Sequence, residues 1–163
     1  MSTVLEGLPT EADERFLRRA IAGAHASRAA GHRPFCSLVV LDGEVIADSS
    51  MTRYTDATSH TEMRVVREAS AKHAPQALAR ATLYASTEPC AMCAGGAYWA
   101  GIGRVVFGFS EASLRKLTGP HPANPTLALP CRELFARGSR AIEVIGPYLE
   151  DEAAAPHRGY WDS

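Results

Sequence analysis

The sequence predicts a three-layer α/β/α sandwich built on a mixed, mostly five-stranded β-sheet. Two observations predict this class. In the second half of the chain, segments with helical spacing of apolar residues alternate with short apolar runs, an order that favours parallel strands joined by helices. Before them, two apolar runs are separated by Asp42-Gly43, a dipeptide typical of an antiparallel hairpin turn. We therefore expect parallel strands behind an initial hairpin.

The expected elements follow these patterns in chain order. The first is a helix from Thr10 to Ala30, which begins at an N-capping hydroxyl and carries apolar side chains at helical spacing. The expected strands comprise residues 35–41, 45–47, 82–85, 104–109 and 141–145. The other expected helices comprise residues 59–72, 90–100, 131–137 and 148–155. The proline-rich stretch from Leu117 to Pro130 is expected to be an irregular loop.

Size and composition predict one domain across residues 1–163, in which residues 147–163 are expected to form a C-terminal helix and tail. The chain has 163 residues, of which 46% are hydrophobic, and carries mixed charges, as soluble globular proteins do. No apolar run reaches the length of a membrane span, and no secretory signal is visible at the N-terminus. Four cysteines without such a signal favour a cytoplasmic protein, where a Cys-x-x-Cys pair more often serves metal or redox chemistry.

The charge balance favours a small-molecule substrate over a nucleic acid. The formal net charge is −1, and the acidic run Glu150-Asp151-Glu152 lies near the C-terminus. A protein that grips a long nucleic acid usually presents a basic surface, because phosphate neutralisation supplies most of the affinity. We therefore expect no nucleic-acid partner and no membrane partner.

Four residues decide the expected chemistry: His60, Glu62, Cys90 and Cys93. They form the pattern His-x-Glu followed downstream by Pro-Cys-x-x-Cys. One imidazole and two thiolates leave the fourth position of a tetrahedral zinc ion open, as a catalytic zinc requires. The cysteines lie one turn apart near the start of an expected helix, where the helix dipole favours thiolates. We expect one Zn²⁺ per chain, held by His60, Cys90 and Cys93.

Glu62 is the expected catalytic residue, because the metal does not need its carboxylate as a ligand. Zinc lowers the pKa of bound water to about 7, and a neighbouring carboxylate can carry that proton to a ring nitrogen and then to a departing amine. A competing interpretation places Glu62 in a capping box with Ser59. The downstream cysteine pair favours catalysis.

Three alternatives to a catalytic zinc site stay open. The Cys-x-x-Cys pair could be a redox pair of the thioredoxin type, or part of a structural zinc site, although no fourth ligand is in view. The chain could also be a non-catalytic scaffold stabilised by zinc, but a structural site has no need of Glu62. Cys36 and Cys131 are expected to be ordinary buried residues.

The motif is the signature of zinc-dependent nucleobase deaminases, and the chain resembles the cytidine deaminase-like superfamily. Within it, the stretches from Thr87 to Ala97 and from Ile102 to Gly108 are similar to the branch of guanine deaminases and tRNA adenosine deaminases. This resemblance implies hydrolytic release of ammonia from a free nucleobase or nucleoside, with a guanine-like ring as the expected substrate. A tRNA adenosine deaminase and a cytosine or s-triazine deaminase are the alternatives. The resemblance also implies a homodimer.

Candidate substrate contacts follow from places where the chain departs from the family pattern. The family usually has Pro-Phe-Gly where this chain has Pro34-Phe35-Cys36, and His-Ala-Glu where it has His60-Thr61-Glu62. Phe35 and Thr61 are therefore candidates. An Asn that contacts the base or ribose in the family aligns with Met51. Losing that amide would remove orienting hydrogen bonds, so Met51 is a third candidate.

Three aromatic residues complete the candidate substrate contacts. The Tyr98-Trp99-Ala100 stretch is similar to that of guanine deaminases, although core packing is the other interpretation of Trp99. In guanine deaminases of this type a C-terminal tail closes the pocket of the partner subunit. By analogy, Tyr160 or Trp161 would cap a bound base by stacking.

Overall fold

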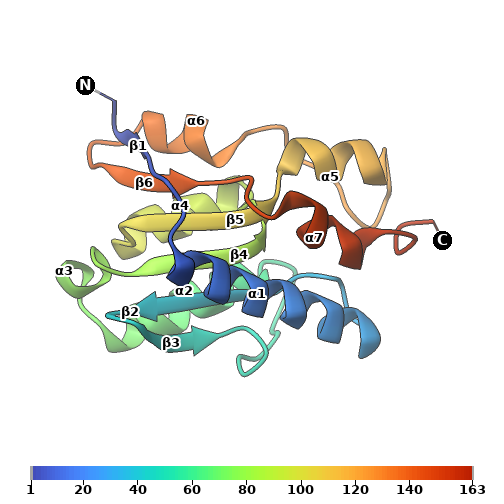
Figure 1. The fold of residues 1–163 in the computed structure, drawn as a ribbon, viewed down its shortest axis with the longest axis horizontal. Coiled ribbons are helices and arrows are strands. Elements are labelled where there is room, and N and C mark those ends of the chain that lie inside the picture. The colour runs from blue at the N-terminus through green and yellow to red at the C-terminus, as the bar shows by residue number, and fades with distance from the viewer. Residues whose placement is uncertain (1, 163) are drawn as a thin grey trace.

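Six strands form one mixed sheet in the order β1-β6-β5-β4-β2-β3 in the computed structural model, which describes residues 2–162 (Figure 1). The strands are β1 (Val4–Glu6), β2 (Ser37–Leu41), β3 (Glu44–Asp48), β4 (Thr82–Thr87), β5 (Arg104–Phe109) and β6 (Ile142–Ile145). β2 pairs antiparallel with β3 and β4, whereas β4, β5, β6 and β1 pair in parallel. The predicted hairpin and the parallel strands behind it are confirmed.

β1 is a sixth strand that the sequence patterns did not predict. Its three residues are too few to show an alternating pattern, and it forms by pairing with β6, where Val4 lies opposite Ile142. The N–H of Ile142 also donates to the carbonyl of Thr3 at 2.9 Å. The mixed sheet is confirmed, with six strands where mostly five were expected.

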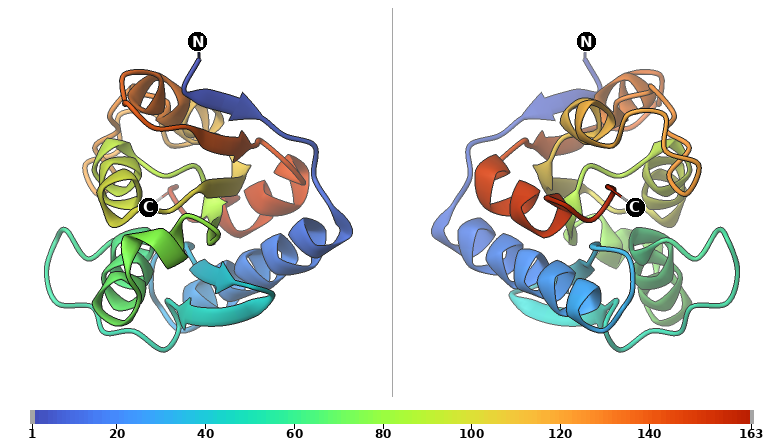
Figure 2. Two further views of the ribbon diagram at one scale, coloured as in Figure 1. Left: turned by 90° about the vertical axis from the view of Figure 1, so that its left-hand side faces the viewer. Right: turned by 90° about the vertical axis from the view of Figure 1, so that its right-hand side faces the viewer.

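Helices cover both faces of the sheet, as the two end views of Figure 2 show. On one face lie α1 (Glu11–Ala29) and α7 (Glu150–Ala154), and on the other lie α2 (Thr61–Lys72), α4 (Ala91–Ala100) and α6 (Cys131–Ala136). The predicted three-layer α/β/α sandwich is confirmed. None of the helices within residues 2–162 is both long and apolar enough to cross a bilayer.

Three short helices were missed by the sequence analysis: α3 (Pro75–Leu78), α5 (Glu111–Thr118) and the 3₁₀ helix η1 (Ala155–His157). The last two residues of α5 fall in the stretch expected to be a loop. The rest of that stretch, residues 119–130, contains neither helix nor strand, as expected. A helix of one or two turns carries too little periodicity to be recognised, and packing against the rest of the fold stabilises it.

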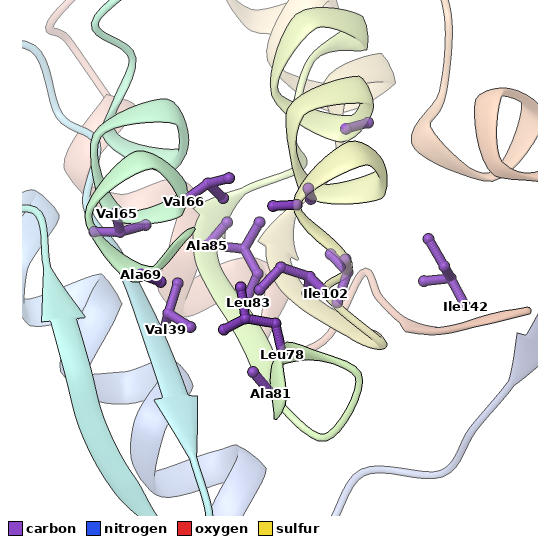
Figure 3. Close-up of a cluster of buried hydrophobic side chains, with 14 of the residues drawn as sticks. Val39, Val65, Val66, Ala69, Leu78, Ala81, Leu83, Ala85, Ile102 and Ile142 are labelled. Carbon is purple, nitrogen blue, oxygen red and sulfur yellow. The ribbon is translucent and has the colours of Figure 1, made fainter. Parts of the chain in front are cut away.

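Two buried clusters fill the spaces between the layers. On the face covered by α2 and α4, Val65 of α2 packs in one cluster with Val39 of β2 and Leu83 of β4 (Figure 3). On the opposite face lies the apolar stripe predicted for α1; its buried members are Phe16, Leu17, Ala20, Ile21 and Ala24. Successive residues of β4 alternate between the faces, since Leu83 belongs to the first cluster and Tyr84 to the second.

Asp13 ties the start of α1 to the middle of the sheet. Thr10 and Asp13 form a capping box, in which each side chain accepts the backbone N–H of the other residue. The Asp13 carboxylate, only 1% exposed, also accepts hydrogen bonds of 2.7 Å from Arg104 Nη2 and from the Tyr84 hydroxyl. Burial alone would raise the pKa of Asp13, but the hydrogen bonds from Arg104, Thr10 and Tyr84 lower it to about 2.

We expect Asp13→Ala to lower the free energy of unfolding by about 3 kcal/mol, because it leaves a partly buried guanidinium and a buried hydroxyl without their partner. Urea unfolding at neutral pH measures the loss. Glu68→Ala is the matched control, since it removes a partly exposed pair with Lys72 on α2 and should cost at most about 0.5 kcal/mol. Equal losses in the two variants would contradict a structural role for Asp13.

The C-terminal segment folds back onto its own chain around His157, whose side chain is fully buried. The His157 ring lies 5.2 Å from Phe35 and 6.3 Å from Trp161, measured between ring centroids. Its Nδ1 accepts a hydrogen bond from Trp161 Nε1 at 3.3 Å. The proton of the neutral ring is therefore on Nε2, which donates to Thr87 Oγ1 at 3.2 Å. Burial lowers the pKa of His157 to about 4.

We expect His157 to make stability depend on pH. The unfolded chain binds a proton at this residue near pH 6.5 and the folded chain only near pH 4, so the contribution is present above pH 6.5 and lost as the pH falls. Between pH 7.5 and 5, the free energy of unfolding should fall by about 2 kcal/mol more in the wild type than in His157→Gln. Urea unfolding of both proteins at the two pH values tests this, and parallel losses would contradict it.

Candidate metal centre and active site

His60, Cys90 and Cys93 come together where the N-termini of α2 and α4 meet. Figure 2 shows the two helices on the same face of the sheet, and they contact each other. His60 is the N-cap residue of α2, Cys90 is the N-cap residue of α4, and Cys93 lies in the first turn of α4. The Nδ1 atom of His60 is 3.6 Å from each Sγ atom, and the two Sγ atoms are also 3.6 Å apart. Among residues 2–162, this is the group of metal-binding side chains whose ligand atoms all lie within 4.8 Å of one another.

This donor set fits a zinc ion. Zinc bonds of about 2.3 Å to sulfur and about 2.0 Å to nitrogen, at tetrahedral angles, separate the ligand atoms by roughly 3.5–3.8 Å. The three observed separations agree with that geometry. Cys93 is buried and His60 is exposed, so the centre opens toward the surface and is not sealed in the core. Three protein ligands with an open side are typical of a catalytic site.

The electrostatics of the centre favour the thiolate form of Cys90, while His60 and Cys93 hold their protons more firmly. The hydrogen bond with Cys93, together with the neighbouring His60, lowers the pKa of Cys90 to about 4. The contact with Cys90 raises the pKa of His60, and it also raises the pKa of Cys93, whose burial acts in the same direction. Cysteine binds metals as thiolate and histidine as neutral imidazole, so binding here would release protons.

Glu62 lies beside the three donors as a buried carboxylate, 7% exposed. Its Oε2 atom is 3.7 Å from Cys93 Sγ and 3.1 Å from Thr61 Oγ1. Burial raises the pKa of Glu62. In a regular helix residues i and i+2 face different directions, but His60 has the extended ψ of 153° and stands outside α2. This break in helical geometry lets His60 and Glu62 face the same centre.

The capping-box interpretation of Glu62 is wrong. The helix begins at Thr61, and its N-cap residue, His60, makes no side-chain capping hydrogen bond. Ser59 Oγ instead accepts the N–H groups of Thr55 and Asp56 in the preceding loop, both at 3.2 Å. The Glu62 side chain is therefore available to the centre.

The candidate substrate contacts separate into two groups. Phe35 and Trp161 share the aromatic cluster around His157, and Tyr160 packs on Trp161 with ring centroids 4.7 Å apart. Thr61 is buried next to Glu62 and hydrogen-bonds to it. Phe35, Tyr160 and Trp161 therefore belong to the aromatic cluster of the C-terminal segment, whereas Thr61 lies at the centre itself.

Met51 and Trp99 lie at the surface, with 85% and 84% of their area exposed. The alternative expectation that Trp99 packs in the core is therefore wrong. Near Met51, the buried polar residue is Ser49, whose Oγ accepts the N–H of Ser37 at 3.0 Å and donates to Cys36 Sγ at 3.2 Å. Cys36 and Cys131 are buried, as expected.

Glu88 is a supporting residue whose function sequence reasoning left open. It is buried, and its carboxylate accepts the N–H of Glu111 at 3.0 Å and the N–H of Cys131 at 2.9 Å. These are the first residues of α5 and α6, so one carboxylate caps two helices. The only signal in the sequence was an acidic residue directly before Pro89-Cys90.

Comparison with known proteins agrees with this geometry. A family model described as MafB19-like deaminase matches residues 11–124. The chain is 40% identical over 155 residues to a probable cytosine deaminase of Schizosaccharomyces pombe, covering 94% of each chain. It is 38% identical over 98 residues to a tRNA-specific adenosine deaminase of Bacillus subtilis, covering 59% of this chain and 61% of that relative.

A solved structure in complex with 8-azaguanine matches the fold with a TM-score of 0.70 and 27% identity, covering 91% of this chain and 83% of the other. The sheet order, the site at the two helix N-termini and these matches agree with one another. The chain belongs to the MafB19-like deaminase family, and its fold is that of the cytidine deaminase-like enzymes.

Proposed function

We propose that this deaminase removes the amino group of a free nucleobase by hydrolysis, releasing ammonia. The observation that carries the proposal is the His60, Cys90 and Cys93 set with ligand atoms 3.6 Å apart and a buried carboxylate, Glu62, beside it. The three donors would hold one Zn²⁺ per chain. Glu62 is the proposed catalytic residue.

A zinc ion in this set would activate water for attack on the ring carbon that bears the amino group. Glu62 accepts one proton from the attacking water and donates it to a ring nitrogen; it then accepts the second proton, from the newly added hydroxyl group, and donates it to the departing amine. Its burial supports this function, because burial raises the pKa of Glu62 and so lets the carboxyl group hold a transferred proton more readily.

Cytosine is the first candidate substrate. The relative that matches over nearly the whole length, at 40% identity, is described as a probable cytosine deaminase. A guanine-like purine is the second candidate, supported by the resemblance in residues 87–108 and by the related structure that binds 8-azaguanine. The net charge of −1 and the acidic residues 150–152 support a small substrate over tRNA.

The C-terminal segment is proposed to form one wall of the pocket. Trp161 and Phe35 lie in one aromatic cluster, and His157 connects this cluster to Thr87, three residues before Cys90. Apolar rings of this kind can stack on the face of a base. A homodimer also stays a proposal, which the exposed Trp99 on α4 supports.

Removing a proposed ligand should abolish zinc binding. We expect about one zinc per chain in the wild type, and an affinity more than about 100-fold lower in Cys93→Ala, since even indirect changes at zinc sites cost about 10- to 100-fold. Metal analysis after dialysis against a weak chelator measures this. Cys131→Ala is the matched control, because that thiol is buried away from the centre and should not affect zinc content. Full zinc content in Cys93→Ala would contradict the proposed ligand set.

Glu62→Gln should keep its zinc and lose at least about 10²-fold in the rate of ammonia release, since it removes the proton carrier. Ammonia release from cytosine, guanine, adenosine and a tRNA anticodon stem-loop identifies the substrate in the wild type. Activity on the RNA alone, with salt-sensitive binding, would replace the proposed free base by tRNA. Undiminished turnover by Glu62→Gln would refute its catalytic function.

A further inference from the structure

Two buried hydroxyl groups connect the sheet to Glu62. Thr61 Oγ1 lies 3.1 Å from Glu62 Oε2, and Ser37 Oγ lies 2.9 Å from Thr61 Oγ1. Ser37 is fully buried, and Thr61 is 8% exposed. Ser37 begins β2, so the connection runs from the sheet through the first residue of α2 to the carboxylate.

The direction of these hydrogen bonds follows from the number of protons. Each hydroxyl has one proton to donate and accepts through its lone pairs. When Glu62 is ionised, Thr61 donates to Oε2, and Ser37 must then be the donor to Thr61 Oγ1. Both hydroxyl dipoles point toward the carboxylate. Hydrogen bonds to an ionised acceptor are stronger than those between neutral groups, so an ionised Glu62 favours this direction of both hydrogen bonds.

Both hydroxyl groups are held in place by their surroundings. Thr61 is β-branched, which restricts its first side-chain torsion. The backbone N–H of Ser37 donates to Ser49 Oγ on the segment that follows β3, at 3.0 Å. The hydroxyl pair therefore connects Glu62 to β2 of the sheet, while Cys93 Sγ lies 3.7 Å from the same carboxylate oxygen.

We propose that Thr61, supported by Ser37, is a positioning residue that orients the Glu62 carboxylate for proton transfer. The proposal rests on the proposed deaminase function of Glu62. The sequence made Thr61 a candidate substrate contact. In this assignment it acts instead through Glu62 and does not contact the substrate.

Three variants test the proposal by separating kcat from KM. Thr61→Val keeps the shape and removes the hydroxyl, Thr61→Ser keeps the hydroxyl, and Ser37→Ala removes only the supporting donor. We expect Thr61→Val to lower kcat by about 10- to 100-fold with KM unchanged, because a displaced catalytic group costs rate and not binding. Thr61→Ser should restore most of kcat, and Ser37→Ala should lower kcat by a smaller factor than Thr61→Val.

Zinc content and urea unfolding of each variant separate positioning from a structural function. Full zinc content and a native unfolding midpoint beside a reduced kcat support the proposal. A rise in KM at constant kcat would make Thr61 a substrate contact, and an unchanged kcat in Thr61→Val would overturn the proposal outright. If Thr61→Val does not fold, Ser37→Ala decides by the same criteria. A wild type that releases ammonia from neither the free bases nor the RNA would overturn the deaminase function of Glu62, and this inference with it. An active wild type beside a Thr61→Val variant with unchanged kcat overturns this inference alone.

Discussion

The candidate centre depends on the close approach of α2 and α4. A Cβ atom at Gly96 of α4 would lie 2.5 Å from Met63 Sδ of α2, so the Met63 thioether occupies the space that the glycine leaves between the two helices. Met63 follows Glu62, and its backbone hydrogen-bonds to the Cys93 side chain. Because both helices begin at this crossing, their N-cap residues, His60 and Cys90, leave helical geometry at the same place. A larger residue at position 96 would first displace the flexible end of the Met63 side chain, next to Glu62 in sequence.

The carboxyl end of β4 organises the segments around this crossing. Ser86 Oγ accepts the N–H of Cys36, Thr87 accepts from His157, and Glu88 caps α5 and α6. Cys90 follows directly after Pro89. Successive residues at one strand end therefore hold the loop before β2, the C-terminal segment and the two helices that follow β5. Each contact satisfies a buried polar group, which would otherwise carry a desolvation cost of about 1–3 kcal/mol.

Buried polar side chains are concentrated near this strand end and near Glu62, while the two apolar clusters fill the rest of the interior. The hydroxyl pair of Ser37 and Thr61 shows what these buried polar groups do for the Glu62 carboxylate. A carboxylate placed against an apolar core would be poorly oriented and costly to ionise, whereas one that accepts a hydrogen bond from a rigid donor keeps a defined direction. Stability and the proposed chemistry thus use the same contacts.

The sequence alone predicted the helices, strands and metal-binding side chains that short-range sequence patterns mark. The stripe of α1, the Asp42-Gly43 hairpin and the alternation of strands and helices predicted the sandwich, because periodicity and turn chemistry are properties of neighbouring residues. The spacing of His60, Cys90 and Cys93 likewise indicated the set that the structure brings within 4.8 Å. Only the tertiary structure decided the rest. β1, the partners of Glu88, the burial of His157 and the surface position of Met51 depend on contacts between residues far apart in the chain. Such contacts arise when the layers pack, and no short window of sequence contains them.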